Sequence, residues 1–149
     1  MRQTQMVYTR IAPQHETDWL VFSSCLFLFP CVYAVIYRMW FYATVLWATS
    51  FFSCVYWIYP IHGFRRNMDL WFSKVAFFVF FGSGILYVRP LPFALIGYSG
   101  AVIIGVCFYM SHATFDSPIR NWWKFHVWFH ILLMCEQFLV LHCIYHRQS

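Results

Sequence analysis

The chain has 149 residues, of which 62% are hydrophobic and only 10% charged, and its formal net charge is +5. A soluble domain usually carries about 25% charged residues, so this composition excludes a single water-soluble domain, which would lack the residues for a polar surface. The basic excess does not indicate nucleic-acid binding, because the basic residues flank apolar segments and no nucleic-acid-binding motif accompanies them.

Long apolar segments fill almost the whole chain. A helix needs about 20 predominantly apolar residues to cross a bilayer, and a crossing segment must pair its own backbone polar groups. We therefore predict an all-α integral membrane bundle, multi-pass, that forms one domain. The predicted transmembrane helices cover residues 19–37, 40–59, 70–88, 91–110 and 122–143.

Taken in chain order, the local signals agree with these segments. Residues 1–18 form a short polar N-terminal tail, and Pro30 is expected to kink the first helix, because proline lacks the N–H that a helix interior uses. Pro60 ends the second helix, and Pro90 flanks a tight turn between the third and fourth helices. Glycines in the third and fourth helices favour close contact between helices.

The distribution of Lys and Arg predicts the orientation. Five crossings place the two termini on opposite sides of the membrane, and the cytoplasmic side usually carries the excess of basic residues. One side has Arg2, Arg10, Arg65, Arg66, Lys74, Arg120 and Lys124, and the other has Arg38, Arg89 and Arg147. We therefore expect a cytoplasmic N-terminus and a C-terminus on the opposite side.

The same topology gathers polar side chains at one membrane face. Ionisable residues inside a membrane are costly, so they usually face a bundle interior or a cavity. Residues distant in sequence share this face because the helices alternate in direction. They are Ser53, His62, Asp69, His112, Asp116, His126 and His130. The sequence therefore predicts a polar site at this face.

The sharpest motif in that set is the pair His126 and His130, whose four-residue spacing places both imidazoles on one face of a helix. Two histidines at this spacing suit one metal ion, which needs a third and a fourth ligand. His112 and Asp69 are the best placed for this role, and His62 is a further candidate in a loop. The competing interpretation is that these are interfacial histidines that only bind backbone carbonyls or water. Haem held by His112 and His126 is a further alternative.

Two other features of the last segment stay open. His142 and His146 repeat the four-residue spacing near its other end, on roughly the opposite helical face, so they cannot share a site with the first pair. Glu136 lies in the middle of the membrane, where it either bonds to a neighbouring helix or relays protons.

Four stretches resemble a known superfamily: residues 23–30 (SSCLFLFP), 51–57 (FFSCVYW), 81–84 (FGSG) and 126–133 (HVWFHILL). They are similar to the CREST superfamily of membrane proteins, which contains the alkaline ceramidases, the progestin and adipoQ receptors and the lipid-remodelling proteins that act on GPI anchors. Its members typically have seven helices, two more than this chain presents. Its pattern is Ser and His at the end of one helix, Asp at the start of the next, and His-x-x-x-His in the last.

The resemblance implies a zinc-dependent hydrolase of amide or ester bonds in lipids. Ser53 matches the serine, Asp69 lies near the place of the aspartate, and His126 and His130 match the histidine pair. In that chemistry zinc generates hydroxide, Asp69 accepts the proton, and Ser53 stabilises the oxyanion. Trp57 stands where the first histidine ligand is expected, so the zinc site is either lost or rebuilt with His112.

Two functions are therefore open. One is a divergent CREST-like zinc-dependent lipid hydrolase, or its inactive scaffold, with membrane lipids as its partners. The other is a non-enzymatic structural or accessory subunit that packs aromatic helices against other membrane subunits.

Overall fold

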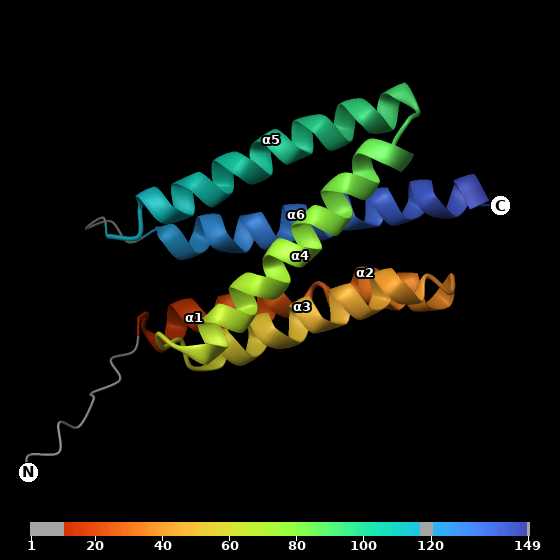
Figure 1. Ribbon diagram of the computed structural model, residues 1–149. Coiled ribbons are helices and arrows are strands. Elements are labelled where there is room, and N and C mark those ends of the chain that lie inside the picture. Colours follow the sequence, from red (N-terminus) through yellow and green to blue (C-terminus); the bar gives the residue numbers. More distant parts are fainter. Residues whose placement is uncertain (1–10, 117–120, 149) are drawn as a thin grey trace, which may run out of the picture.

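All regular structure that the computed structural model describes is helical. It describes residues 11–116 and 121–148, so most of the predicted polar tail lies outside the described residues. Figure 1 shows the helices in chain order. They are α1 (Gln14–Cys25), α2 (Leu28–Ile36), α3 (Trp40–Ile58), α4 (Phe64–Tyr87), α5 (Leu91–Ala113) and α6 (Trp122–Gln148).

The five predicted membrane-crossing segments are confirmed. Each of the five is long and apolar enough to cross a membrane, with α1 and α2 together forming the first. Many large apolar side chains on these helices are exposed, for example Phe78 and Tyr109, and such a surface suits contact with lipid tails. The all-α multi-pass architecture therefore follows from both the sequence and the structure.

The predicted kink at Pro30 is a break between α1 and α2. The amides of Leu26 and Phe27 donate three residues back, to the carbonyls of Ser23 and Ser24. Proline has no N–H for the carbonyl four residues before it, and its ring crowds that carbonyl. The break therefore falls at residues 26–27, one turn before the proline itself.

Two helix starts differ from the prediction. The first helix begins at Gln14, inside the predicted tail, and α4 begins at Phe64, six residues before the predicted start at residue 70. Gly63 precedes α4 with φ of 140°, a conformation that L side chains rarely adopt, so it allows the chain to reverse just before the helix. Polar and basic residues then form a first turn that a search for apolar runs misses.

The helices are arranged as two groups joined by α4. Helices α1, α2 and α3 lie along one side of the molecule, and the antiparallel pair α5 and α6 lies along the other (Figure 1). Helix α4 runs diagonally and contacts both α3 and α6. Helix α6 also contacts α1 and α2, so it is the central helix of the bundle, and Leu46, Phe80 and Leu141 pack where the groups meet.

Close packing of α5 on α6 depends on glycine. The Glu136 carboxyl of α6 lies against Gly97 and Gly100 of α5, and a Cβ added at Gly100 would collide with that carboxyl. The glycines therefore provide the space for a carboxyl group in the middle of the membrane, as the sequence suggested for small residues in these helices.

This packing predicts that Gly100→Leu destabilises the protein by about 1–3 kcal/mol, because a large side chain must displace Glu136 or separate α5 from α6. Thermal unfolding in detergent measures the effect. Gly105→Leu is the matched control, because no atom lies within 4 Å of a Cβ at Gly105. Equal melting temperatures for the two variants would contradict this description of the α5–α6 contact.

Candidate functional site

The candidate site is a layer of polar side chains near the membrane face at which α1, α4 and α6 begin, which we call the proximal face. Hydroxyl, imidazole and carboxyl groups from five helices meet there, all of them buried except His126, which is half-buried. They are Ser23 and Ser24 of α1, Ser50 and Ser53 of α3, Asp69 of α4, Ser111 of α5, and His126 and His130 of α6. This set is called the polar layer below.

His130 connects α6 to α1. Its Nδ1 lies 2.9 Å from the Ser23 hydroxyl, and the two side chains are 4% and 0% exposed. The same hydroxyl donates to the Leu20 carbonyl at 3.1 Å. A serine hydroxyl has one proton, so both hydrogen bonds form together when His130 carries its proton on Nδ1. The ring of Phe27 packs edge-on against this imidazole.

His126 connects α6 to α5 and α3. Its Nδ1 lies 3.2 Å from the hydroxyl of Ser111, which is buried. Its ring is 4.8 Å from that of His130 and 5.3 Å from that of Trp57, measured between centroids. The sequence prediction that both imidazoles share one helical face is confirmed, because the two rings are in contact.

A second group of hydrogen bonds joins α1 to α3, and Asp69 of α4 lies next to it. The hydroxyls of Ser24 and Ser53 are 2.9 Å apart, and Ser50 donates to the Ser24 carbonyl at 2.9 Å. The carboxyl of Asp69 lies close to the Ser53 hydroxyl on the neighbouring helix. The predicted proximity of Ser53 and Asp69 is therefore observed, and α1 supplies their third partner.

The start of α6 is held at the same face by Glu16 of α1. The Trp122 indole donates to a Glu16 carboxyl oxygen at 3.1 Å, and both side chains are buried. The Trp57 ring packs 5.9 Å from that of Trp122, and the rings of Trp57, Trp122 and His126 all contact one another. Tryptophan therefore fills the position at which the resemblance expects a histidine ligand.

Three of the predicted site residues lie at the edge of this layer. His112 is exposed, its ring packs against Phe108, and the neighbouring Ser111 is the residue that bonds to His126. Asp116 is exposed, as is His62, which contacts Arg66.

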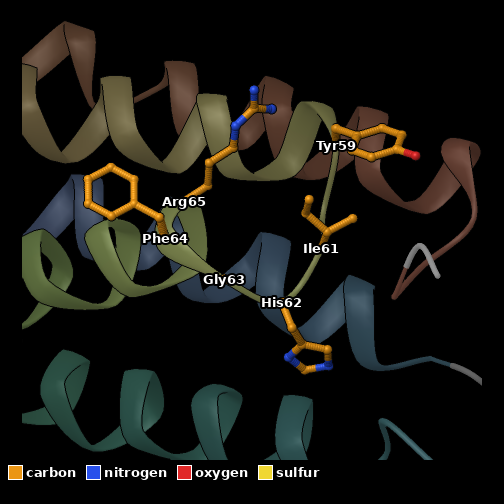
Figure 2. A pocket seen from close by; sticks show the side chains of 6 residues that line it. All are labelled: Tyr59, Ile61, His62, Gly63, Phe64 and Arg65. Atoms are coloured by element: carbon orange, nitrogen blue, oxygen red, sulfur yellow. The ribbon is translucent and has the colours of Figure 1, made fainter. Parts of the chain in front are cut away.

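The loop between α3 and α4 lines a hollow of about 460 Å³. Figure 2 shows its side chains spread around the loop, with His62 and Arg65 pointing away from each other. Arg66 contacts His62 at 3.5 Å and lies near Tyr56, while Asp69 lies near Ser53. The polar side chains of this loop therefore do not converge on one point at which they could bind a ligand together.

The described residues do not fit a zinc ion as the resemblance implies it. Zinc in catalytic sites takes three protein ligands, and no three His, Cys, Asp or Glu side chains among the described residues form a group that could hold a metal. The indole nitrogen of Trp57 is buried and has no hydrogen-bond partner among the described residues. An indole N–H donates and cannot ligate, so this group fits an acceptor such as water and not a cation.

Comparisons with protein-family models, with curated proteins and with solved structures found no match to this chain. The CREST resemblance therefore stays a prediction from the four quoted stretches, and the site is argued from its geometry.

The serines of the polar layer were not predicted as a set. Ser23 and Ser24 appear in the quoted stretches only as part of a resemblance, and Ser50 and Ser111 were not singled out. One signal was available: Ser50 and Ser53 lie three residues apart, so they share a helical face in an otherwise apolar segment.

The hydrogen bond between Ser23 and His130 predicts a measurable coupling between α1 and α6. Ser23→Ala leaves a buried imidazole nitrogen unpaired and is expected to cost about 1–3 kcal/mol of unfolding free energy. In a double-mutant cycle with His130→Phe, the coupling energy is expected to be about 0.5–3 kcal/mol.

Ser99→Ala is the control for this cycle, because the exposed Ser99 hydroxyl only bonds to a carbonyl of its own helix. A coupling energy near zero between Ser23 and His130 would show that the two helices are not joined through this contact.

Proposed function

We propose that this chain is a multi-pass membrane protein built on a CREST-like scaffold, in which a serine–histidine hydrogen-bond network takes the place of the zinc site. On this proposal the protein is non-catalytic and acts as a membrane-embedded binding or accessory subunit. Its partners are membrane lipids and other membrane proteins, which contact its aromatic outer surface.

The observation that carries the proposal is the position of Trp57. Its side chain is 6% exposed and packs against both His126 and Trp122. It fills the space beside His126 with a ring that has no lone pair to give to a metal. Catalysis by a zinc-bound water needs three protein ligands and an open fourth position. Trp57 replaces one expected ligand, and its large indole also fills the space beside His126.

The bonding of the two histidines also supports this proposal. Each Nδ1 contacts a serine hydroxyl of a different helix, Ser23 for His130 and Ser111 for His126. Contacts of this kind across helices stabilise a bundle in a membrane, where hydrogen bonds between helices contribute to association. On the proposed function, Ser53 and Asp69 also act as structural groups that join α3 to α4.

The exposed surface supports a role in contact with other molecules. In α5 only Ile104 and Ser111 are buried, and its exposed side chains include Phe108 and Tyr109. Large aromatic side chains at such a surface suit lipid tails, headgroups or the helices of another membrane protein. The zinc-dependent lipid hydrolase remains the second candidate, because His126 and His130 lie together at the centre of the layer.

One substitution separates these candidates. If the scaffold is CREST-like and lacks only its first ligand, Trp57→His supplies the third imidazole next to His126 and His130. We expect purified wild-type protein to retain no zinc and the Trp57→His variant to retain about one zinc per chain, measured by elemental mass spectrometry.

Two controls make that comparison specific. Trp57→Phe opens space without adding a ligand, and Trp128→His adds an imidazole at an exposed position of α6. Neither is expected to gain zinc. About one zinc per wild-type chain, lost in His126→Ala/His130→Ala, would overturn the non-catalytic proposal and favour the hydrolase.

We also propose that the proximal face is cytoplasmic. The described basic residues near it are Arg65, Arg66, Lys74 and Lys124, and three further arginines counted for this side lie outside the described residues. The other face has Arg38, Arg89 and Arg147. The side with more basic residues is expected to stay in the cytoplasm.

This orientation predicts opposite labelling of two single cysteines in a cysteine-free background. In intact cells, a membrane-impermeant maleimide is expected to react with Pro90→Cys but not with His62→Cys, because the two exposed loops lie on opposite faces. Permeabilised cells, in which both variants should react, are the control. Labelling of His62→Cys alone in intact cells would reverse the orientation.

A further inference from the structure

A second group of basic side chains lies at the opposite face, where α2, α4 and α6 end, which we call the distal face. It lines a pocket of about 290 Å³ between the ends of α4 and α6 and the start of α5. The pocket contains the second histidine pair, for which the proposed function has no role. Its polar lining comes from Tyr87, Arg89, His142, His146 and Arg147.

The two guanidinium groups that line this pocket donate to the same backbone oxygen. Arg89 Nε donates to the Leu86 carbonyl at 3.2 Å, and Arg147 Nη1 donates to the same oxygen at 3.0 Å. The Arg147 guanidinium also lies over the Tyr87 ring, 5.3 Å from its centroid. Arg89 and Arg147 come from segments far apart in sequence, so the fold brings two like charges together.

No carboxylate side chain is near enough to balance these charges. The chain has five acidic residues, and none is among the lining residues of this pocket. Four of them lie at or near the proximal face, and the fifth, Glu136, packs against glycines in the middle of α5. The five are Glu16, Asp18, Asp69, Asp116 and Glu136. Two adjacent guanidinium groups with no carboxylate side chain beside them among the described residues suit an anion from outside the chain.

The arginines keep donors for such an anion. A guanidinium has five N–H donors in a planar fork, and each of these groups is seen to use one on Leu86. The rings of His142 and His146 are 4.3 Å apart and add further N–H donors on the same side. Phe93 packs edge-on against His142 and supplies an apolar wall.

We propose that this pocket binds the phosphate of an anionic phospholipid in the leaflet at the distal face. The phosphate oxygens match the paired, forked donors of two arginines. The pocket lies at the ends of membrane-spanning helices, the depth at which lipid headgroups lie, and basic pockets between such helices bind anionic headgroups. The lipid tails would continue along the apolar outer surfaces of α4 and α5.

The test is native mass spectrometry of the full chain released from nanodiscs of phosphatidylcholine that contain a minor fraction of phosphatidylglycerol. We expect wild-type protein to retain phosphatidylglycerol selectively over phosphatidylcholine. Arg89→Gln and Arg147→Gln should each reduce that selectivity about fivefold, from roughly 1 kcal/mol for each basic residue at a membrane surface.

Arg38→Gln is the matched control. Arg38 is the third arginine at the distal face and does not line the pocket, so its loss removes the same charge from the same side. Selectivity should stay unchanged in this variant. Equal losses in all three variants, or no loss in any, would overturn the proposal, because the attraction would then come from general surface charge or from another site.

Two further measurements test whether each variant is folded and whether the pocket binds free phosphate instead of a lipid. Arg147→Lys keeps the charge and should retain more selectivity than Arg147→Gln, and elution as a single species on size exclusion shows that each variant is folded. Millimolar inorganic phosphate should leave the lipid bound. Complete displacement by phosphate would overturn the lipid assignment and identify a site for free phosphate.

Discussion

The interior of a membrane offers no water to a buried polar group, so such a group must find its hydrogen-bond partners within the protein. In this chain that constraint acts through the bond between His130 of α6 and Ser23 of α1. It joins the central helix to the first helix just before the break that precedes Pro30. The bond of His126 to Ser111 does the same between α6 and α5. The polar layer thus fixes how the groups of helices approach one another at the proximal face.

The hydrogen bonds between serines and histidines also underlie the proposed non-catalytic function. A zinc hydrolase needs polar groups that converge on a substrate or a metal, whereas the serines and histidines here converge on each other. Trp57 reinforces this arrangement, because its ring fills the space beside His126. The distal pocket is different, since Arg89 and Arg147 converge without a carboxylate partner. At the proximal face the serines and histidines thus hydrogen-bond to one another. At the distal face the two arginines keep N–H donors for a ligand from outside the chain.

The sequence predicted the fold in outline because the energetic cost of polar groups in lipid leaves a strong signal in composition. Each long apolar segment is helical, and the break of the first into α1 and α2 was anticipated from the missing donor of Pro30. The early start of α4 at Phe64 was missed, because Arg65 and Arg66 interrupt the apolar pattern while still being helical. Patterns of hydropathy report where lipid lies along a helix, and they do not report where the helix itself begins.

The sequence predicted the membrane face at which the candidate site lies, but not which side chains bond to one another there. The topology correctly placed Ser53, Asp69, His126 and His130 together, since that depends on helix direction alone. The partners were not predictable, because they depend on how each helix is rotated about its axis. Ser111 and His112 are adjacent in sequence, yet rotation of α5 turns Ser111 toward His126 and leaves His112 exposed. Hydropathy gives little information on such rotations in a helix that is apolar on all sides.

The central claim is that the histidines of the polar layer are held by serine hydroxyls and not by a metal ion. Nitrogen-15 NMR of histidine-labelled protein in detergent tests it most directly, with Ser23→Ala used to assign the His130 ring. We predict that His130 carries its proton on Nδ1 and that the His126 and His130 signals do not change when a strong zinc chelator is added. Joint movement of both ring signals on chelation would show that a bound metal, and not the serine network, holds the two histidines.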